Sequence, residues 1–150
     1  MSHSYSSCLI HYVFSTKDRR KLILPAWRDR LWAYLGGIGR ENAMKALAVG
    51  GTDDHAHVLA ALPSTLSVAK AIQLLKGGSS KWVHDSFPEA KTFAWQEGYG
   101  AFSIGVSAIH DTIAYIERQV EHHSTKTFEE EFIAFLERHG IEYDPRYVFG

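Results

Sequence analysis

Hydrophobic residues in the first half of the chain follow two periods, one typical of strands and one typical of helices. The apolar run from Cys8 to Ser15 is rich in residues that favour β-structure and predicts a first strand. Apolar residues then recur three and four apart, which predicts a helix from about residue 25 to residue 40. Two short runs, Ala43 to Val49 and His55 to Leu62, follow. We expect them to pair as antiparallel strands across Gly-Gly-Thr-Asp-Asp, because glycine permits the positive φ that such turns often need.

The middle of the chain predicts one more helix and one more strand. Ser64 or Thr65 can cap a second helix, and its apolar residues keep the helical spacing as far as Leu75. We expect this helix to loosen at the Gly77-Gly78 pair. The segment from Trp95 to Val106 mixes aromatic and β-branched residues with glycines and predicts a fourth strand with a bend.

The last third of the chain is predicted to be helical. A third helix is expected from Ser107 and a fourth from Phe128 to Leu136, each with a stripe of apolar residues. The order β-α-β-β-α-β followed by helices predicts an α+β protein of the split βαβ type. Its antiparallel sheet carries helices on one face and leaves the other free for a ligand or a further helix.

Length and composition are consistent with one domain over residues 1–150. The chain is 45% hydrophobic and has no internal repeat or linker, so it can bury one core. Cys8 is the single cysteine and cannot form an internal disulfide. No apolar stretch reaches the roughly 18 residues of a membrane span, and no segment resembles a secretory signal. We therefore expect a cytoplasmic protein that does not contact a membrane.

The overall charge argues mildly against nucleic-acid binding, but its distribution does not. The formal net charge is -1 and the pI is about 6.7, whereas phosphate binders usually carry a basic excess. Basic residues nevertheless gather early and recur in the middle of the chain, at Lys17, Arg19, Arg20, Lys21, Lys70, Lys76 and Lys81. A local basic surface is thus compatible with a neutral total, although ordinary solvated charge is the commoner explanation.

The triplet His55-Ala56-His57 provides half of a metal site. Residues two apart in a strand point to the same side, so the two imidazoles share one face of the sheet. Imidazole suits Zn, Mn, Fe or Ni, whereas phosphate chemistry commonly recruits Mg or Mn. Asp53 and Asp54 are available as ligands or as groups that orient the rings. Two structural histidines at a strand end are the alternative, but polar residues in an apolar strand usually have a task or a partner.

Tyr115 and Gln119 lie four residues apart and therefore on one flank of the third predicted helix. The amide oxygen of Gln119 is a possible third ligand. A tyrosine hydroxyl has an ordinary pKa of about 10 and attacks poorly at neutral pH, but a divalent ion at a phosphodiester assists the attack. The resulting phosphotyrosine ester conserves the energy of the broken bond, so the strand can be rejoined. Amphipathic packing of the ring is the ordinary alternative.

The two motifs together resemble a known family. Gly-Gly-Thr-Asp-Asp-His-Ala-His-Val-Leu followed by Tyr-Ile-Glu-Arg-Gln is similar to the single-tyrosine HUH transposases of small bacterial insertion sequences, the IS200-like transposases, in which HUH denotes His-hydrophobe-His. It is also similar to their relatives associated with repetitive extragenic palindromes (REP). Further segments that resemble the family are residues 11–17, 75–82, 95–103 and 140–144.

This resemblance implies a ferredoxin-like fold, a homodimer, and an enzyme that cuts and rejoins single-stranded DNA at element ends marked by hairpins. It implies His55, His57 and Gln119 as ligands of Mg or Mn, and Tyr115 as the nucleophile that forms a 5′-phosphotyrosine. In such dimers the tyrosine helix can serve the histidines of the partner, so each site can be composite.

Other residues are candidates for contacts with DNA. Lys76 and Lys81 flank a Gly-Gly-Ser-Ser segment and could hold phosphates, and Trp82 could stack on an unpaired base. The first loop offers three further cations for the same task, Lys17, Arg19 and Arg20. Three histidines near the tyrosine are expected at the surface, namely His110, His122 and His123.

Three other functions share the same residues. A domesticated, repeat-associated HUH nuclease would use the same chemistry. A non-catalytic nucleic-acid-binding module on the same fold would leave the histidines incidental. An HUH enzyme of replication initiation or plasmid nicking would usually be a longer chain with a helicase.

Overall fold

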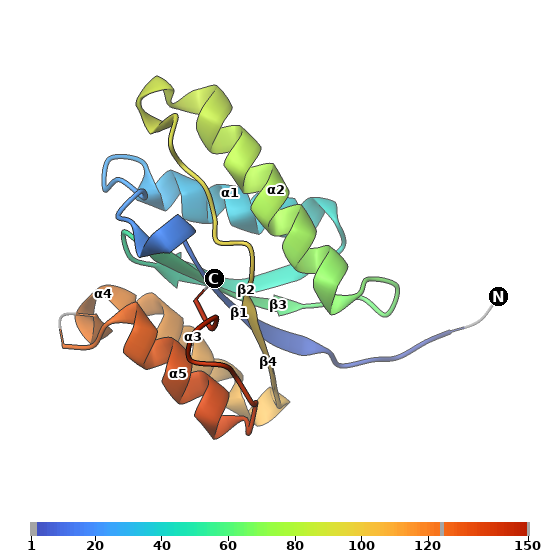
Figure 1. Cartoon of the computed structure of the whole chain (residues 1–150). Coiled ribbons are helices and arrows are strands. Elements are labelled where there is room, and N and C mark those ends of the chain that lie inside the picture. The colour runs from blue at the N-terminus through green and yellow to red at the C-terminus, as the bar shows by residue number, and fades with distance from the viewer. Residues whose placement is uncertain (1–2, 124, 150) are drawn as a thin grey trace.

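A four-stranded antiparallel sheet in the order β2-β3-β1-β4 organises the chain (Figure 1). The structure is a computed structural model that describes residues 3–123 and 125–149. The strands are β1 (Leu9–Ser15), β2 (Lys45–Gly51), β3 (His55–Ala61) and β4 (Gly100–Ile104). This strand order, with the helices between the strands, confirms the predicted α+β, ferredoxin-like fold.

Helices cover both faces of the sheet (Figure 1). One face carries α1 (Arg28–Glu41) and α2 (Val68–Ser86). The opposite face, which the sequence left free for a ligand or a helix, is covered by α3 (Ile109–Glu117), α4 (Gln119–His122) and α5 (Phe128–Arg138). Short 3-10 turns occur at Lys17–Arg19, Pro88–Ala90 and Val106–Ala108. Within the described ranges, no helix combines the length and apolar character that crossing a membrane requires.

The alternation of side chains along β1 separates two cores. Tyr12 and Phe14 are fully buried in the larger core, which lies under α1 and α2. His11 and Val13 point to the other face, where Val13 joins a smaller core of phenylalanines from β4 and α5. Because Val13 lies opposite His57 in the antiparallel register, this second face also receives the side chains of the His-x-His triplet.

Helix α2 runs unbroken through the Gly77-Gly78 pair, so the predicted loosening is wrong. A Cβ at Gly78 would lie 2.9 Å from the Cδ1 atom of Ile38 in α1. Glycine therefore serves close packing between two helices here. The cap is also later than predicted, because the Oγ atom of Ser67 accepts a hydrogen bond from the backbone N–H of Lys70 at 3.0 Å.

Strand β4 is much shorter than predicted. Trp95 forms an isolated bridge with Thr16, and the chain bends before the strand begins. The ammonium group of Lys76 donates hydrogen bonds to the carbonyl oxygens of Gln96 and Gly98, at 2.5 and 2.9 Å, and holds the bend in place. The predicted bend is correct, but a lysine from α2 replaces the strand pairing that the pattern suggested.

The predicted third helix is interrupted. It begins at Ile109 after a 3-10 turn and ends at Glu117, and the backbone of Arg118 (φ −102°, ψ 22°) leaves the helical region. Helix α4 then starts at Gln119. Tyr115 and Gln119 consequently lie on two consecutive helices rather than on one.

Gly50 in β2 marks a close approach between α3 and the sheet. A Cβ at this residue would lie 2.6 Å from the carbonyl oxygen of Ile116, a backbone atom that cannot rotate away. We expect Gly50→Ala to displace α3 and to lower the free energy of unfolding by about 1–3 kcal/mol, measured by urea denaturation. Gly77→Ala is the matched control, since no atom lies within 4 Å of its added Cβ. Alanine there should stabilise the helix by about 0.5–1 kcal/mol; equal effects at both glycines would contradict this account.

Candidate metal and nucleophile site

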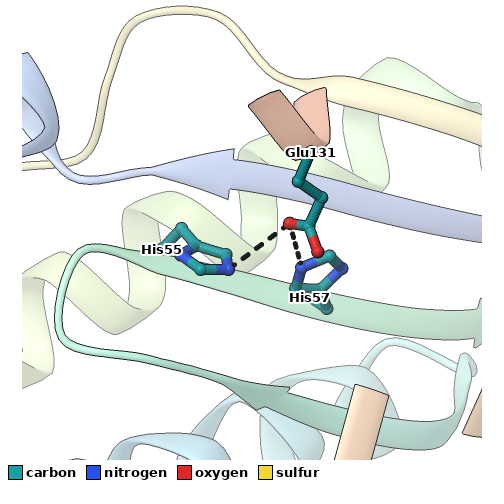
Figure 2. A group of neighbouring side chains, drawn as sticks. All are labelled: His55, His57 and Glu131. Atoms are coloured by element: carbon teal, nitrogen blue, oxygen red, sulfur yellow. Dashed lines mark hydrogen bonds and ion pairs between the residues drawn. The ribbon is translucent and has the colours of Figure 1, made fainter. Parts of the chain in front are cut away.

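The two histidines of the triplet are fully buried side by side on the face of the sheet that α3 and α5 cover. His55 is the first residue of β3 and His57 the third, so strand geometry points both rings the same way. Figure 2 shows both rings turned toward the carboxylate of Glu131, which comes from α5. The Nε2 atoms of His55 and His57 lie 3.5 and 3.0 Å from its Oε1 atom.

The second nitrogen of each ring has its own partner. The Nδ1 atom of His55 lies 2.8 Å from the Oδ1 atom of Asp54 and 3.0 Å from the Oγ1 atom of Thr52. Burial alone would raise the pKa of Asp54, but the hydrogen bonds with His55 and Thr52 and the nearby charges of His55 and His123 together lower it. Of the two aspartates predicted as ligands or orienting groups, Asp54 thus contacts a ring. Carboxylates that orient a histidine in this way are typical of metal sites.

His57 is held by a third histidine that the sequence analysis did not identify. Its Nδ1 atom shares a hydrogen bond of 2.8 Å with the Nε2 atom of His11 on β1. Burial lowers the pKa of both rings, and their mutual repulsion would lower the pKa of His11 further. Both rings are therefore neutral near pH 7, which is the state that metal binding requires.

The structure brings Gln119 and Tyr115 to the same place within one chain. Gln119 is 1% exposed, and its Oε1 atom lies 2.8 Å from the Nε2 atom of His55. The hydroxyl of Tyr115 donates a hydrogen bond to the Oε2 atom of Glu131. Burial raises the pKa of Tyr115, and the neighbouring carboxylate of Glu131 raises it further, so the hydroxyl is protonated at neutral pH.

Glu131 is the residue at the centre of the site that sequence reasoning missed. It is 2% exposed, and besides the two histidines and Tyr115 it accepts a hydrogen bond from the Nε2 atom of Gln119 at 3.3 Å. Burial would raise its pKa, but the ion pair with His123, the hydrogen bond with His57 and the charges of the neighbouring imidazoles hold it well below the usual range. A signal was present, because Glu131 interrupts the apolar stripe of α5 formed by Phe128, Phe132 and Phe135.

His123 also lies at the site, which corrects its prediction as a surface residue. Its Nε2 atom forms an ion pair with the Oε2 atom of Glu131 at 3.2 Å, and its side chain is 11% exposed. Burial would lower its pKa, but the carboxylate of Glu131 raises it above the ordinary value. His110 is exposed as predicted, and the side chain of His122 lies outside the described residues.

The donor atoms form a candidate site for a single metal ion. The ligand atoms of His55, His57 and Glu131 all lie within 4.8 Å of one another. Two ligands that bind one ion at about 2.0–2.3 Å lie no more than about 4.6 Å apart, and the two histidine–Glu131 distances, 3.0 and 3.5 Å, are within that limit. Gln119 adds a further oxygen beside His55. Imidazole with carboxylate and amide oxygens can hold a divalent ion such as Mn.

The candidate DNA contacts on α2 are not brought to this site. Lys76, Lys81 and Trp82 belong to the helix on the opposite face of the sheet. Besides the bonds of Lys76 at the bend, Lys81 pairs with Asp85 at 2.7 Å and Trp82 stacks on Tyr34 with 4.7 Å between ring centres. Their contact with DNA stays a prediction.

The three cations of the first loop lie in or beside the 3-10 turn that follows β1. Lys17 and Arg20 are exposed. Arg19 reaches toward α5, where its Nε atom lies 3.6 Å from the carboxylate of Glu129, and its guanidinium lies 5.1 Å from the ring centre of Phe149. Arg19 thus borders the face that carries the site, and a role of all three in DNA binding likewise stays a prediction.

Comparison with known proteins identifies the family. The sequence model of the family described as IS200-like transposases matches residues 4–119. The chain belongs to the IS200-like transposase family. The matched segment contains both motif histidines, Tyr115 and Gln119, but it ends before α5, so Glu131 and His123 lie outside it.

Individual relatives agree with this assignment. The transposases for insertion sequence element IS200 of Salmonella typhimurium LT2 and Salmonella typhi are each 27% identical over 128 residues, which cover 81% of this chain and 82% of theirs. The fold is similar to a solved candidate transposase of Deinococcus radiodurans R1 (TM-score 0.63, 21% identity, 79% of this chain and 96% of that one). It is also similar to a REP-associated tyrosine transposase bound to a REP hairpin (TM-score 0.59, 16% identity, 82% and 73%).

Proposed function

We propose that this family member is a DNA transposase that cuts and rejoins single-stranded DNA at hairpin-marked element ends through a 5′-phosphotyrosine. One observation carries the proposal. The hydroxyl of Tyr115 and the donor atoms of His55, His57 and Gln119 converge on one buried carboxylate, that of Glu131. The hairpin in the complex of the REP-associated relative supports this class of substrate. We place the activity in the cytoplasm and in one domain over residues 1–150.

The chemistry assigned to Tyr115 is a transesterification. Its Oη atom attacks the phosphorus, the bond from phosphorus to the 3′-oxygen of the preceding nucleotide breaks, and that oxygen takes up a proton from the solvent, to which Glu131 releases the proton that it accepts from Tyr115. The hydroxyl proton passes to the carboxylate of Glu131, which already accepts its hydrogen bond. Attack by a 3′-hydroxyl on the phosphotyrosine reverses the step and joins strands without a further source of energy.

His55, His57 and Gln119 would hold Mg or Mn, with Glu131 as an additional oxygen donor. A divalent ion there withdraws charge from the phosphate and stabilises the transition state. His11 and Asp54 fix the two rings through their outer nitrogens. Two buried histidines beside an ionised carboxylate form a donor set that serves metal binding and has no evident use in a non-catalytic module.

A domesticated, repeat-associated nuclease with the same chemistry is the second candidate. The similarity of fold to the REP-associated tyrosine transposase favours it. The two candidates differ in the DNA around the gene, where paired terminal palindromes indicate a mobile element and scattered repeats indicate domestication.

We also infer that the protein acts as a homodimer, as its family resemblance implies. The contacts of His55, His57, Tyr115 and Gln119 within one chain support a dimer in which each copy uses its own site rather than a composite one.

Replacing Tyr115 by Phe should abolish the covalent adduct and leave binding of single-stranded hairpin DNA within about twofold. The assay incubates purified protein with DNA from its own genomic element and Mg or Mn, and resolves protein–DNA adducts on a denaturing gel. Tyr147→Phe, at a tyrosine that is 69% exposed, is the matched control and should form the adduct normally. An adduct formed by the Tyr115→Phe protein, or none formed by folded wild type with authentic ends, would overturn the cutting mechanism.

Metal affinity separates the proposed ligands from their neighbours. Glu131→Gln keeps the size of the side chain and removes the charge, and we expect it to weaken Mn binding about 10- to 100-fold, as loss of a ligand or its support commonly does. Gln119→Leu should weaken binding to a smaller extent, because a neutral ligand is lost. Glu130→Gln is the control, since Glu130 is fully exposed and belongs to the capping box of α5. Electron paramagnetic resonance of free Mn measures all three; unchanged affinity in Glu131→Gln would exclude Glu131 as a ligand.

Mixed dimers test the arrangement of the sites. We expect light scattering to give twice the mass of one chain. Mixing the His57→Ala and Tyr115→Phe proteins should not restore cleavage above the level of either alone, because each copy supplies its own histidines and tyrosine. Restored cleavage would instead show that the tyrosine acts on the partner's metal site.

A further inference from the structure

A hollow of about 470 Å³ opens beside Tyr115, between β4 and the helices α3 and α5. Aromatic rings form its walls. Phe102 and Phe135 stack with 5.1 Å between ring centres and an interplanar angle of 18°, and the ring of His139 lies 4.8 Å from that of Phe102. Polar groups stand at the rim, among them the side chains of Ser103 and Asp111. Apolar walls with a few polar groups are typical of a pocket for a small planar ligand.

A second, smaller cavity of about 170 Å³ adjoins this hollow. Tyr115, Phe135 and Arg138 line both cavities. Lys126 and Glu131 line the smaller cavity but not the larger hollow. The tyrosine therefore lies where a charged recess meets an aromatic one.

This junction matches the two parts of a nucleotide. A phosphate attacked by Tyr115 must lie at its hydroxyl, and Arg138 lines the same two cavities as Tyr115, with its guanidinium 5.4 Å from the ring centre of Phe135. Arginine pairs readily with phosphate oxygens. The base of the same nucleotide then reaches the aromatic hollow, where stacking on Phe102, Phe135 or His139 accepts any base and the rim offers hydrogen bonds. A base within a duplex is stacked and paired, so entry requires an unpaired strand.

We propose that the hollow seats one unpaired nucleobase next to the scissile phosphate and that Arg138 holds that phosphate. The proposal rests on the proposed function, because it takes Tyr115 to mark the reacting phosphate. It assigns the ligand of this hollow as a nucleobase of single-stranded DNA. It also places both contacts on α5 and β4, and α5 lies beyond the segment that the family model matches.

Photocrosslinking locates the base. Single-stranded oligonucleotides from the ends of the chain's own element carry 5-iodouracil at one position at a time and are irradiated with the Tyr115→Phe protein, which leaves the strand uncut. We expect one position to crosslink to peptides that contain Phe102, Phe135 or His139. Crosslinks confined to other peptides, such as that of Trp82 on α2, or no crosslink at any position, would overturn the proposal.

Filling the hollow tests its contribution to affinity. Thr112 lines the hollow one turn before Tyr115, and Ser103 lines it from β4, so Thr112→Phe and Ser103→Phe each occupy its space from a different element. His110→Phe is the matched control, because His110 is exposed on α3 and does not line the hollow. In the Tyr115→Phe background, removing the crosslinked base should weaken binding roughly 5- to 150-fold in the parent and in the control. The same abasic strand should bind either filled variant as well as the intact strand does.

Two results distinguish this inference from the proposed function. If removing the base still weakens binding to both filled variants, the hollow does not hold the base, and the proposed cleavage by Tyr115 is unaffected. If removing the base no longer weakens binding to the filled variants, the hollow does hold the base. If the wild type then forms no covalent adduct, the proposed strand transfer is wrong although the base-binding hollow stands. Arg138→Gln should weaken binding of the intact and abasic strands by the same factor, because it acts on the phosphate; an effect on the intact strand alone would contradict that role.

Discussion

The contact of the Glu131 carboxylate with the two histidines of β3 is the interaction on which the site depends. An ionised carboxylate inside a protein is unfavourable unless hydrogen bonds and opposite charge compensate it. Here His57, Gln119 and Tyr115 supply hydrogen bonds and His123 supplies an ion pair. These groups come from β3, α3, α4 and the turn after it, whereas the carboxylate comes from α5. Satisfying one buried charge therefore gathers Tyr115, the proposed nucleophile, and the proposed metal ligands around the same point.

The two faces of the sheet carry different kinds of residues, an apolar core on one and the polar site on the other. On one face, Tyr12, Phe14 and Val58 pack under α1 and α2 in a large apolar core. On the other face, His11, His55 and His57 replace the apolar residues that would be expected there, and a smaller group of phenylalanines seals the site. Because neighbouring residues of each strand point to opposite faces, the same strands contribute to the large apolar core and present the histidines to the site.

The parts of this arrangement that follow from local geometry were predictable from the sequence. Strand alternation placed His55 and His57 on one face, and helical spacing placed Tyr115 near Gln119 despite the break at Arg118. Glu131 and His11 were not predictable in the same way. Their partners are far away in the sequence, and the packing of α5 on the sheet and the register of β1 with β3 decide which side chains meet. The bend before β4 was predicted, but the role of Lys76 in holding it was not, because its partners are also distant in the sequence.

The ammonium group of Lys76 has a further consequence for the electrostatics of the surface. It is committed to backbone carbonyls, and Lys81 is committed to Asp85, so two cations that composition counts are already neutralised or satisfied within the chain. Only cations that meet phosphates displace counterions when a nucleic acid binds. Lys76 and Lys81 therefore add little to the number of ions that a bound nucleic acid would displace, although both count fully in the net charge of the sequence.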